Sequence, residues 1–153
     1  MKDGRKMDPT EELDFSSEIL SDAYDLVDSK PRIAAREAYA AMLHAAHARI
    51  AAEGMLVPAT HKGVSVIIGD LYRGDAFRAQ SELSQAERWK QAGDYGRGTL
   101  PTVEDAHEAV DAAQKFCDHL RRDTHTRMAE RGAEQPQKVD YPALVNRTKD
   151  QPT

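Results

Sequence analysis

The sequence has little of several features that commonly define a protein class. Its single cysteine, Cys117, cannot form an internal disulfide, which suits a reducing compartment. None of its apolar runs approaches the roughly 18–20 residues that span a bilayer. The basic stretch from Met1 to Lys6 is not followed by the apolar core of a secretory signal. We therefore expect a cytoplasmic protein that makes no membrane contact.

Positive charge is also scarce, because 26 acidic residues outnumber 21 lysines and arginines and leave a net charge of −5. This balance disfavours a nucleic-acid binder that works through bulk positive charge, since neutralising phosphates needs clustered Lys and Arg. It leaves room for a small local phosphate site.

The 153 residues contain enough apolar sequence for one domain. Their apolar positions recur at three- and four-residue spacing, and no alternating strand pattern is present. These patterns predict an all-α antiparallel bundle of four to five helices. The expected helices run from Asp8 to the turn at Ser29, from Pro31 to Glu53, from Thr60 to the stretch before Gly74, from Asp75 to Gln91 and from Thr102 to about Met128.

The composition divides the chain into a flexible N-terminus (1–8), a helical domain (9–128) and a tail (129–153). The tail is rich in polar residues and proline, so we expect it to be disordered or loosely docked. Its one apolar piece, Tyr141-Pro142-Ala143-Leu144-Val145, is either part of that disordered tail or a segment that docks on a partner.

Three motifs follow one another along the domain: Arg36-Glu37-Ala38-Tyr39-Ala40-Ala41-Met42-Leu43-His44-Ala45-Ala46, then Thr60-His61-Lys62-Gly63-Val64, then Arg88 with Gly93-Asp94-Tyr95. This order resembles the HEPN family (higher eukaryote and prokaryote nucleotide-binding domain). It is most similar to a small stand-alone prokaryotic branch with Arg-x-Ala-Tyr-Tyr-Ala-Met-Phe-His-Ala-Ala, Thr-His-x-Gly-Val and Arg…Ala-Asp-Tyr. The resemblance covers roughly residues 11 to 121. It implies a helical bundle that forms a two-fold homodimer, with the Arg-containing motif lining a cleft between the subunits.

The resemblance makes Arg88, Asp94 and Tyr95 the tentative catalytic residues. Many HEPN ribonucleases carry Arg and, four to six residues later, His, which contact the phosphate and transfer a proton during attack by the ribose 2′-hydroxyl. Here Asp94 stands in place of the His, and an ordinary carboxyl is a poor general acid near neutral pH. In some HEPN toxins a tyrosine just beyond the motif is adenylylated by a partner nucleotidyltransferase, which makes Tyr95 a candidate for modification. The structural alternative is that Asp94 and Tyr95 secure the loop after the helix while Arg88 pairs with an acid.

Four further residues are candidates for binding a ligand or phosphate: Arg36, Tyr39, His61 and Lys62. Arg36 and Tyr39 are three residues apart, so they lie near one face of their helix. His61 and Lys62 stand at an expected helix N-terminus, where backbone N–H groups favour anions. The alternatives are that Thr60 caps the helix and that His61 and Tyr39 pack within the bundle.

We interpret two other groups of residues, a pair of histidines and a set of basic residues, as structural. His44 and His47 have the three-residue spacing of metal ligands, but no cysteine or second cluster of acid and His completes a site, so we predict no metal and no cofactor. Four basic residues near the end of the last expected helix complement its dipole or, alternatively, contact RNA; they are Arg121, Arg122, His125 and Arg127.

From the resemblance we expect a HEPN protein of a prokaryotic toxin–antitoxin or defence pair. It would act with a nucleotidyltransferase-like partner and bind RNA or nucleotide. The alternatives are a non-catalytic helical protein-interaction module and, third, a metal-independent ribonuclease.

Overall fold

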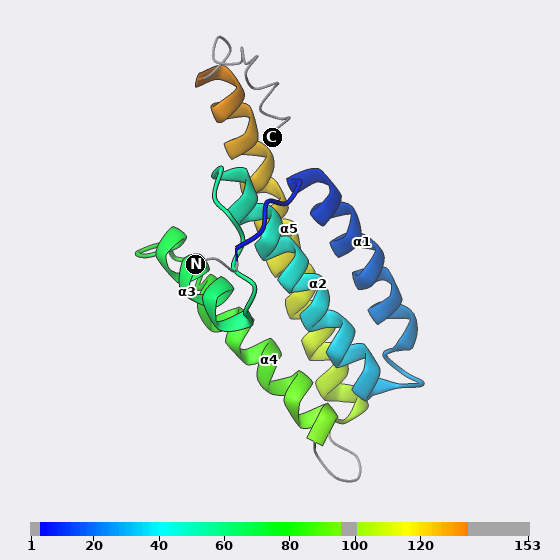
Figure 1. Cartoon of the computed structure of the whole chain (residues 1–153). Helices are drawn as coiled ribbons and strands as arrows, with labels where there is room; N and C mark the ends of the chain where they lie inside the picture. The colour runs from blue at the N-terminus through cyan, green and yellow to red at the C-terminus, as the bar shows by residue number, and fades with distance from the viewer. Residues whose placement is uncertain (1–3, 96–100, 135–153) are drawn as a thin grey trace.

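The computed structural model describes residues 4–95 and 101–134, which form five helices (Figure 1). They are α1 (Pro9–Leu26), α2 (Pro31–Ala52), α3 (His61–Leu71), α4 (Ala79–Tyr95) and α5 (Val103–Glu134). In these residues the only β pairing is an isolated antiparallel bridge between Arg5 and Val57. The predicted all-α bundle is therefore confirmed. The Tyr141–Val145 segment lies outside the described residues.

Capping residues that can be identified in the sequence determine the starts of α1 and α3, and a glycine follows the end of α2. The carboxylate of Asp8 accepts a hydrogen bond from the Thr10 N–H and caps α1, and Pro9 occupies the first helical position. Thr60 caps α3 through the Gly63 N–H at 3.0 Å. Gly54 follows α2 with a φ of 81°, a conformation that glycine adopts at little cost.

Helix α2 lies at the centre of the bundle and contacts all four of the other helices (Figure 1). Ten of its 22 residues are alanine, the strongest helix former, and most of those alanines are buried. Short side chains allow neighbouring helix axes to approach closely on several sides of α2. A helix surrounded in this way fixes the relative positions of its neighbours.

One buried hydroxyl joins three helices. Ser16 on α1 donates from Oγ to the Ala41 carbonyl oxygen on α2 at 2.8 Å, and the same Oγ lies 3.4 Å from the Cys117 sulfur on α5. Burial raises the pKa of the Cys117 thiol to about 11, so this cysteine remains a neutral packing residue.

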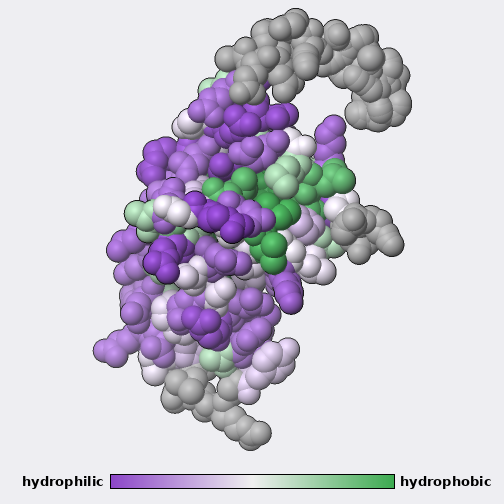
Figure 2. Space-filling model, turned by 90° about the vertical axis from the view of Figure 1, so that its left-hand side faces the viewer, coloured by the Kyte–Doolittle hydropathy of each residue, from purple (hydrophilic) through white to green (hydrophobic). Residues whose placement is uncertain are grey.

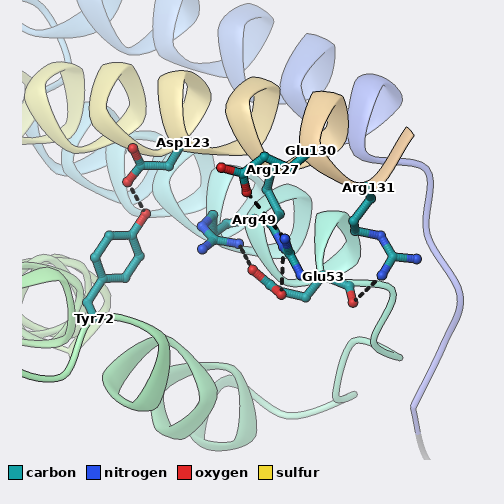
Figure 3. Close-up of polar contacts among 7 residues, drawn as sticks. All are labelled: Arg49, Glu53, Tyr72, Asp123, Arg127, Glu130 and Arg131. Atoms are coloured by element: carbon teal, nitrogen blue, oxygen red, sulfur yellow. Dashed lines mark hydrogen bonds and ion pairs between the residues drawn. The ribbon is translucent and has the colours of Figure 1, made fainter. Parts of the chain in front are cut away.

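The end of the bundle at the α2 C-terminus is held by charged contacts (Figure 3). Glu53, the C-cap of α2, accepts from Arg49 Nη1 at 2.7 Å and from Arg127 Nε of α5 at 3.0 Å. Arg131 donates to the Glu53 carbonyl oxygen at 3.2 Å. Beside this group, the Tyr72 hydroxyl donates to Asp123 of α5 at 2.6 Å. The contacts join α2, the end of α3 and α5.

Two of the basic residues near the end of α5 act between helices, whereas Arg122 contacts His119 on α5 itself. Arg121 donates to the Leu13 carbonyl oxygen and to Ser17 on α1, and Arg127 binds Glu53. Since α5 continues to Glu134, six residues beyond the expected end, Arg121 does not stand at a helix C-terminus. The interpretation of Arg121 as a partner of the helix dipole was wrong.

The expected bounds of α4 were also wrong. The stretch after Gly74 forms a turn in which Asp75 accepts from the Phe77 N–H, so α4 begins at Ala79. At its other end the helix continues through Gly93 to Tyr95. Within the described residues, no helix is long and apolar enough to cross a membrane.

The Glu53 contacts predict a pH-dependent contribution to stability. Burial acts to raise the pKa of Glu53, but the hydrogen bonds and charges of Arg49 and Arg127 outweigh it, and the net pKa is lowered. Glu53→Gln should lower the free energy of unfolding by about 1.5–3 kcal/mol at pH 7, the range for hydrogen bonds to charged groups. Because the folded-state pKa is depressed, this loss is full above the unfolded value of about 4.3 and shrinks as the pH falls below it.

Urea denaturation of the wild type and Glu53→Gln between pH 7 and pH 3 measures this difference. Glu130→Gln is the matched control, because Glu130 pairs with the same Arg127 on the exposed surface. A Glu53→Gln effect that does not depend on pH, or that equals that of Glu130→Gln, would contradict the interpretation.

Candidate functional site

The tentative catalytic residues Arg88, Asp94 and Tyr95 all lie in the C-terminal part of α4, but they do not share one face of it. A seven-residue step returns to the same face of a helix within about 20°, whereas a six-residue step is turned about 120° away. Arg88 and Tyr95 therefore share the outer face of α4, and Asp94 does not. Arg88 donates to Gln85 on its own helix at 2.8 Å, and Tyr95 is 81% exposed. The expected helix-end loop does not form here, because α4 includes both Asp94 and Tyr95.

Asp94 lies near one cation of its own helix, Lys90, and one cation of α2, Arg36. Its Oδ2 lies 2.9 Å from Lys90 Nζ, and its Oδ1 lies 3.8 Å from Arg36 Nη1 on α2. The Arg36 side chain is 49% exposed, so this longer pair leaves much of its guanidinium accessible to solvent. The structure thus places Arg36, predicted as a ligand residue, beside Asp94, predicted as a catalytic residue.

A second arginine fastens the start of α2 to the end of α4. Arg32 donates from Nε to the Gly93 carbonyl oxygen at 2.9 Å. Gly93 is buried, and a Cβ placed there would lie 3.3 Å from Pro101 and 3.4 Å from the Arg32 carbonyl oxygen. A side chain at this position would therefore be in unusually tight contact with its neighbours, which suits a glycine.

These residues border a hollow of about 760 Å³, which we call the α2–α4 cleft. It lies between the turn before α2, the first turns of α2, the last turn of α4 and the start of α5. Its described lining contains three basic side chains and one carboxylate among apolar and small residues; it consists of Ser29, Lys30, Pro31, Arg32, Ile33, Arg36, Gly93, Asp94, Pro101, Thr102 and Val103.

The start of α2 gives the cleft an unusual helix N-terminus. Helices favour acids in their first turn, as α1 and α5 show, but α2 begins with Lys30, Pro31 and Arg32. Lys30 occupies the N-cap position, and its ammonium group has no acceptor with which to cap the helix. Cations and free backbone N–H groups at one helix start together favour a negatively charged group.

Tyr39, the next candidate along α2, is a buried packing residue. It is 3% exposed, and burial together with the Glu87 carboxylate raises the pKa of its hydroxyl, so the ring stays neutral. Its ring meets the edge of His61 with centroids 5.5 Å apart. The expectation that His61 packs against the preceding helix is confirmed.

The turn before α3 is fixed by sterics as well as by its Thr60 cap. A Cβ on Gly63 would lie 2.7 Å from the Cβ of Pro58, so the Thr-His-Lys-Gly order meets a local packing requirement. Lys62 is exposed. His61 and Lys62 are not among the residues that line the cleft, so their expected phosphate contact stays a prediction at a separate place.

The family assignment agrees with this architecture. A family model described as "HEPN domain" matches residues 16–123, from the middle of α1 into the second half of α5. The chain belongs to the HEPN domain family. A search of curated proteins found no match. Family membership supports a helical module with a role related to nucleotides or RNA.

The matched HEPN domain contains the whole of the α2–α4 cleft. Sequence reasoning found Arg36 and Asp94 but missed Lys30, Arg32 and Lys90. The two arginines at the start of α2 could have indicated this site from the sequence. The helix dipole disfavours cations at a helix N-terminus unless a negative group faces them. In this HEPN domain the Gly93 carbonyl oxygen accepts a hydrogen bond from Arg32, and the Asp94 carboxylate pairs with Arg36.

Proposed function

We propose that this HEPN-domain protein binds a phosphate-bearing ligand, RNA or nucleotide, in the α2–α4 cleft. The observation that carries the proposal is the exposed Arg36 guanidinium in a cleft that Lys30 also lines, at the start of α2. Asp94 lies 3.8 Å from Arg36, which is too far for a hydrogen bond, so the guanidinium can form charge-assisted, bidentate hydrogen bonds with an incoming phosphate. Asp94 would then retain Lys90 as its partner.

The proposed role is binding rather than cleavage. None of the described residues that line the cleft is a histidine, and Arg88 lies on another face of α4 from Asp94. The metal-independent ribonuclease therefore ranks below the binding module, since its chemistry needs a cation and a titratable group at one phosphate.

We place this binding protein in a prokaryotic toxin–antitoxin or defence pair with a nucleotidyltransferase-like partner, and we expect it to act as a homodimer. The exposed Tyr95 hydroxyl supports the partner assignment, because a tyrosine that is 81% exposed at a helix end is accessible to a modifying enzyme. The proposed reaction attaches AMP from ATP to the Tyr95 oxygen and releases pyrophosphate.

A helical interaction module is the second candidate function. Figure 2 shows hydrophobic side chains gathered on the face that carries α3, within a largely polar surface. Exposed apolar residues of α3 and of the loop before it include Met55, Leu56 and Val66. Such a patch favours a protein contact.

Binding of a fluorescently labelled, 5′-phosphorylated single-stranded RNA tests the cleft. Arg36→Ala should weaken binding about 10- to 100-fold, the loss expected for a charge-assisted contact. The slope of log K against log salt should fall by about 0.7 for the lost contact. Arg78→Ala is the matched control, because Arg78 is an exposed arginine that does not line the cleft. Equal losses in the two variants, or no loss in Arg36→Ala, would exclude this binding site.

Intact-mass spectrometry of the chain co-expressed with its nucleotidyltransferase partner tests the modification. The wild type should gain one AMP, and Tyr95→Phe should gain none. Tyr24→Phe is the control, because Tyr24 is the other strongly exposed tyrosine in the described residues. An unmodified wild type, or a modified Tyr95→Phe chain, would refute Tyr95 as the acceptor.

A further inference from the structure

A second cluster of chemically active side chains lies between α1 and α2, away from the cleft. Glu12 Oε1 of α1 is 2.7 Å from His44 Nδ1 and 3.2 Å from His47 Nδ1. The two histidines are three residues apart and so project from one face of α2. His44 lies eight residues after Arg36, about 12 Å along the helix axis, so the cluster is separate from the phosphate site.

The spacing of the three side chains is that of a metal site. Each residue offers one ligand atom, and the three atoms all lie within 4.8 Å of one another. Tetrahedral zinc with bonds of about 2.0–2.1 Å holds its ligand atoms about 3.3 Å apart. Small rotations of side chains that are already in contact therefore suffice to surround an ion. Sequence reasoning lacked the third ligand because Glu12 comes from another helix, 32 residues before His44.

The surroundings provide a protected site with an open side. The exposed fractions of the side chains are 11% for Glu12, 12% for His47 and 30% for His44. Solvent reaches the cluster on the His44 side. Three protein ligands with one position left for water form an arrangement that zinc proteins use.

The second imidazole distinguishes this cluster from the other His–carboxylate contacts of the described residues, each of which has one imidazole. A single His–carboxylate pair suffices elsewhere in this chain, as in His107 with Asp28. Here two imidazoles share one carboxylate oxygen, and if both were protonated, each would repel the other. A dication between them uses both nitrogen lone pairs and the carboxylate charge.

We propose that Glu12, His44 and His47 form a Zn²⁺ site that joins α1 to α2. Two imidazole nitrogens and one carboxylate select zinc or a similar transition metal over Mg²⁺ and Ca²⁺, which prefer all-oxygen sets. A bound ion would cross-link the first helix to the central helix near their exposed surface.

Isothermal titration of the metal-free full chain with ZnCl₂ tests the site. The wild type should bind one zinc per chain and gain thermal stability as zinc is added. His44→Asn should lower the affinity more than 10-fold. His107→Asn, the matched control at an exposed His–carboxylate pair, should leave the affinity unchanged.

A measurement on the wild type keeps the proposal testable if His44→Asn folds poorly. Nitrogen NMR of the imidazoles should show His44 and His47 shifting on zinc addition, while His107 and His125 stay in place. An absence of zinc binding would overturn the site, as would equal affinity in the two variants or imidazole shifts confined to other histidines. None of these results depends on RNA binding, so the phosphate proposal and this one can fail separately.

Discussion

The close approach of α2 to its neighbours is the constraint on which the rest of the structure depends. Small side chains on several faces of one helix allow four others to pack directly against it. The Ser16 hydroxyl illustrates how near the backbones come, since it reaches a carbonyl oxygen of α2 and the sulfur of α5 together. At close-packed density, a larger residue at such a position would force neighbouring side chains from their rotamers and shift the backbone. The positions of the polar side chains on α2 relative to the other helices are fixed by the same contacts.

Different stretches of α2 carry the chemistry that this packing positions. Its first turns present Arg32 and Arg36 to the end of α4, its middle presents His44 and His47 to α1, and its last turn presents Arg49 to the α5 network. The polar groups of α2 are therefore separated from one another along the helix axis. A phosphate at the first stretch and a metal at the second would not compete for the same side chains.

Local sequence predicted the starts of α1 and α3 and the end of α2, but it misplaced both ends of α4 and the end of α5. The Asp8 and Thr60 caps and the glycine after α2 depend on neighbours in the chain, so their effects were readable. Gly93 indicated a loop, but it lies within α4, where its carbonyl oxygen accepts from Arg32. That one extension moves Asp94 away from Arg88 and toward Arg36. Glu12 escaped prediction as a metal ligand because its partners come from another helix.

Backbone-amide NMR during titration with a short 5′-phosphorylated RNA tests the central claim most directly, because it locates the ligand without a mutation. The account predicts that the shifts concentrate at Lys30 to Arg36, at Gly93 and Asp94, and at the start of α5. Shifts centred on Arg121 to Arg127, or an unchanged spectrum at saturating RNA, would contradict the assignment of the α2–α4 cleft as the phosphate site.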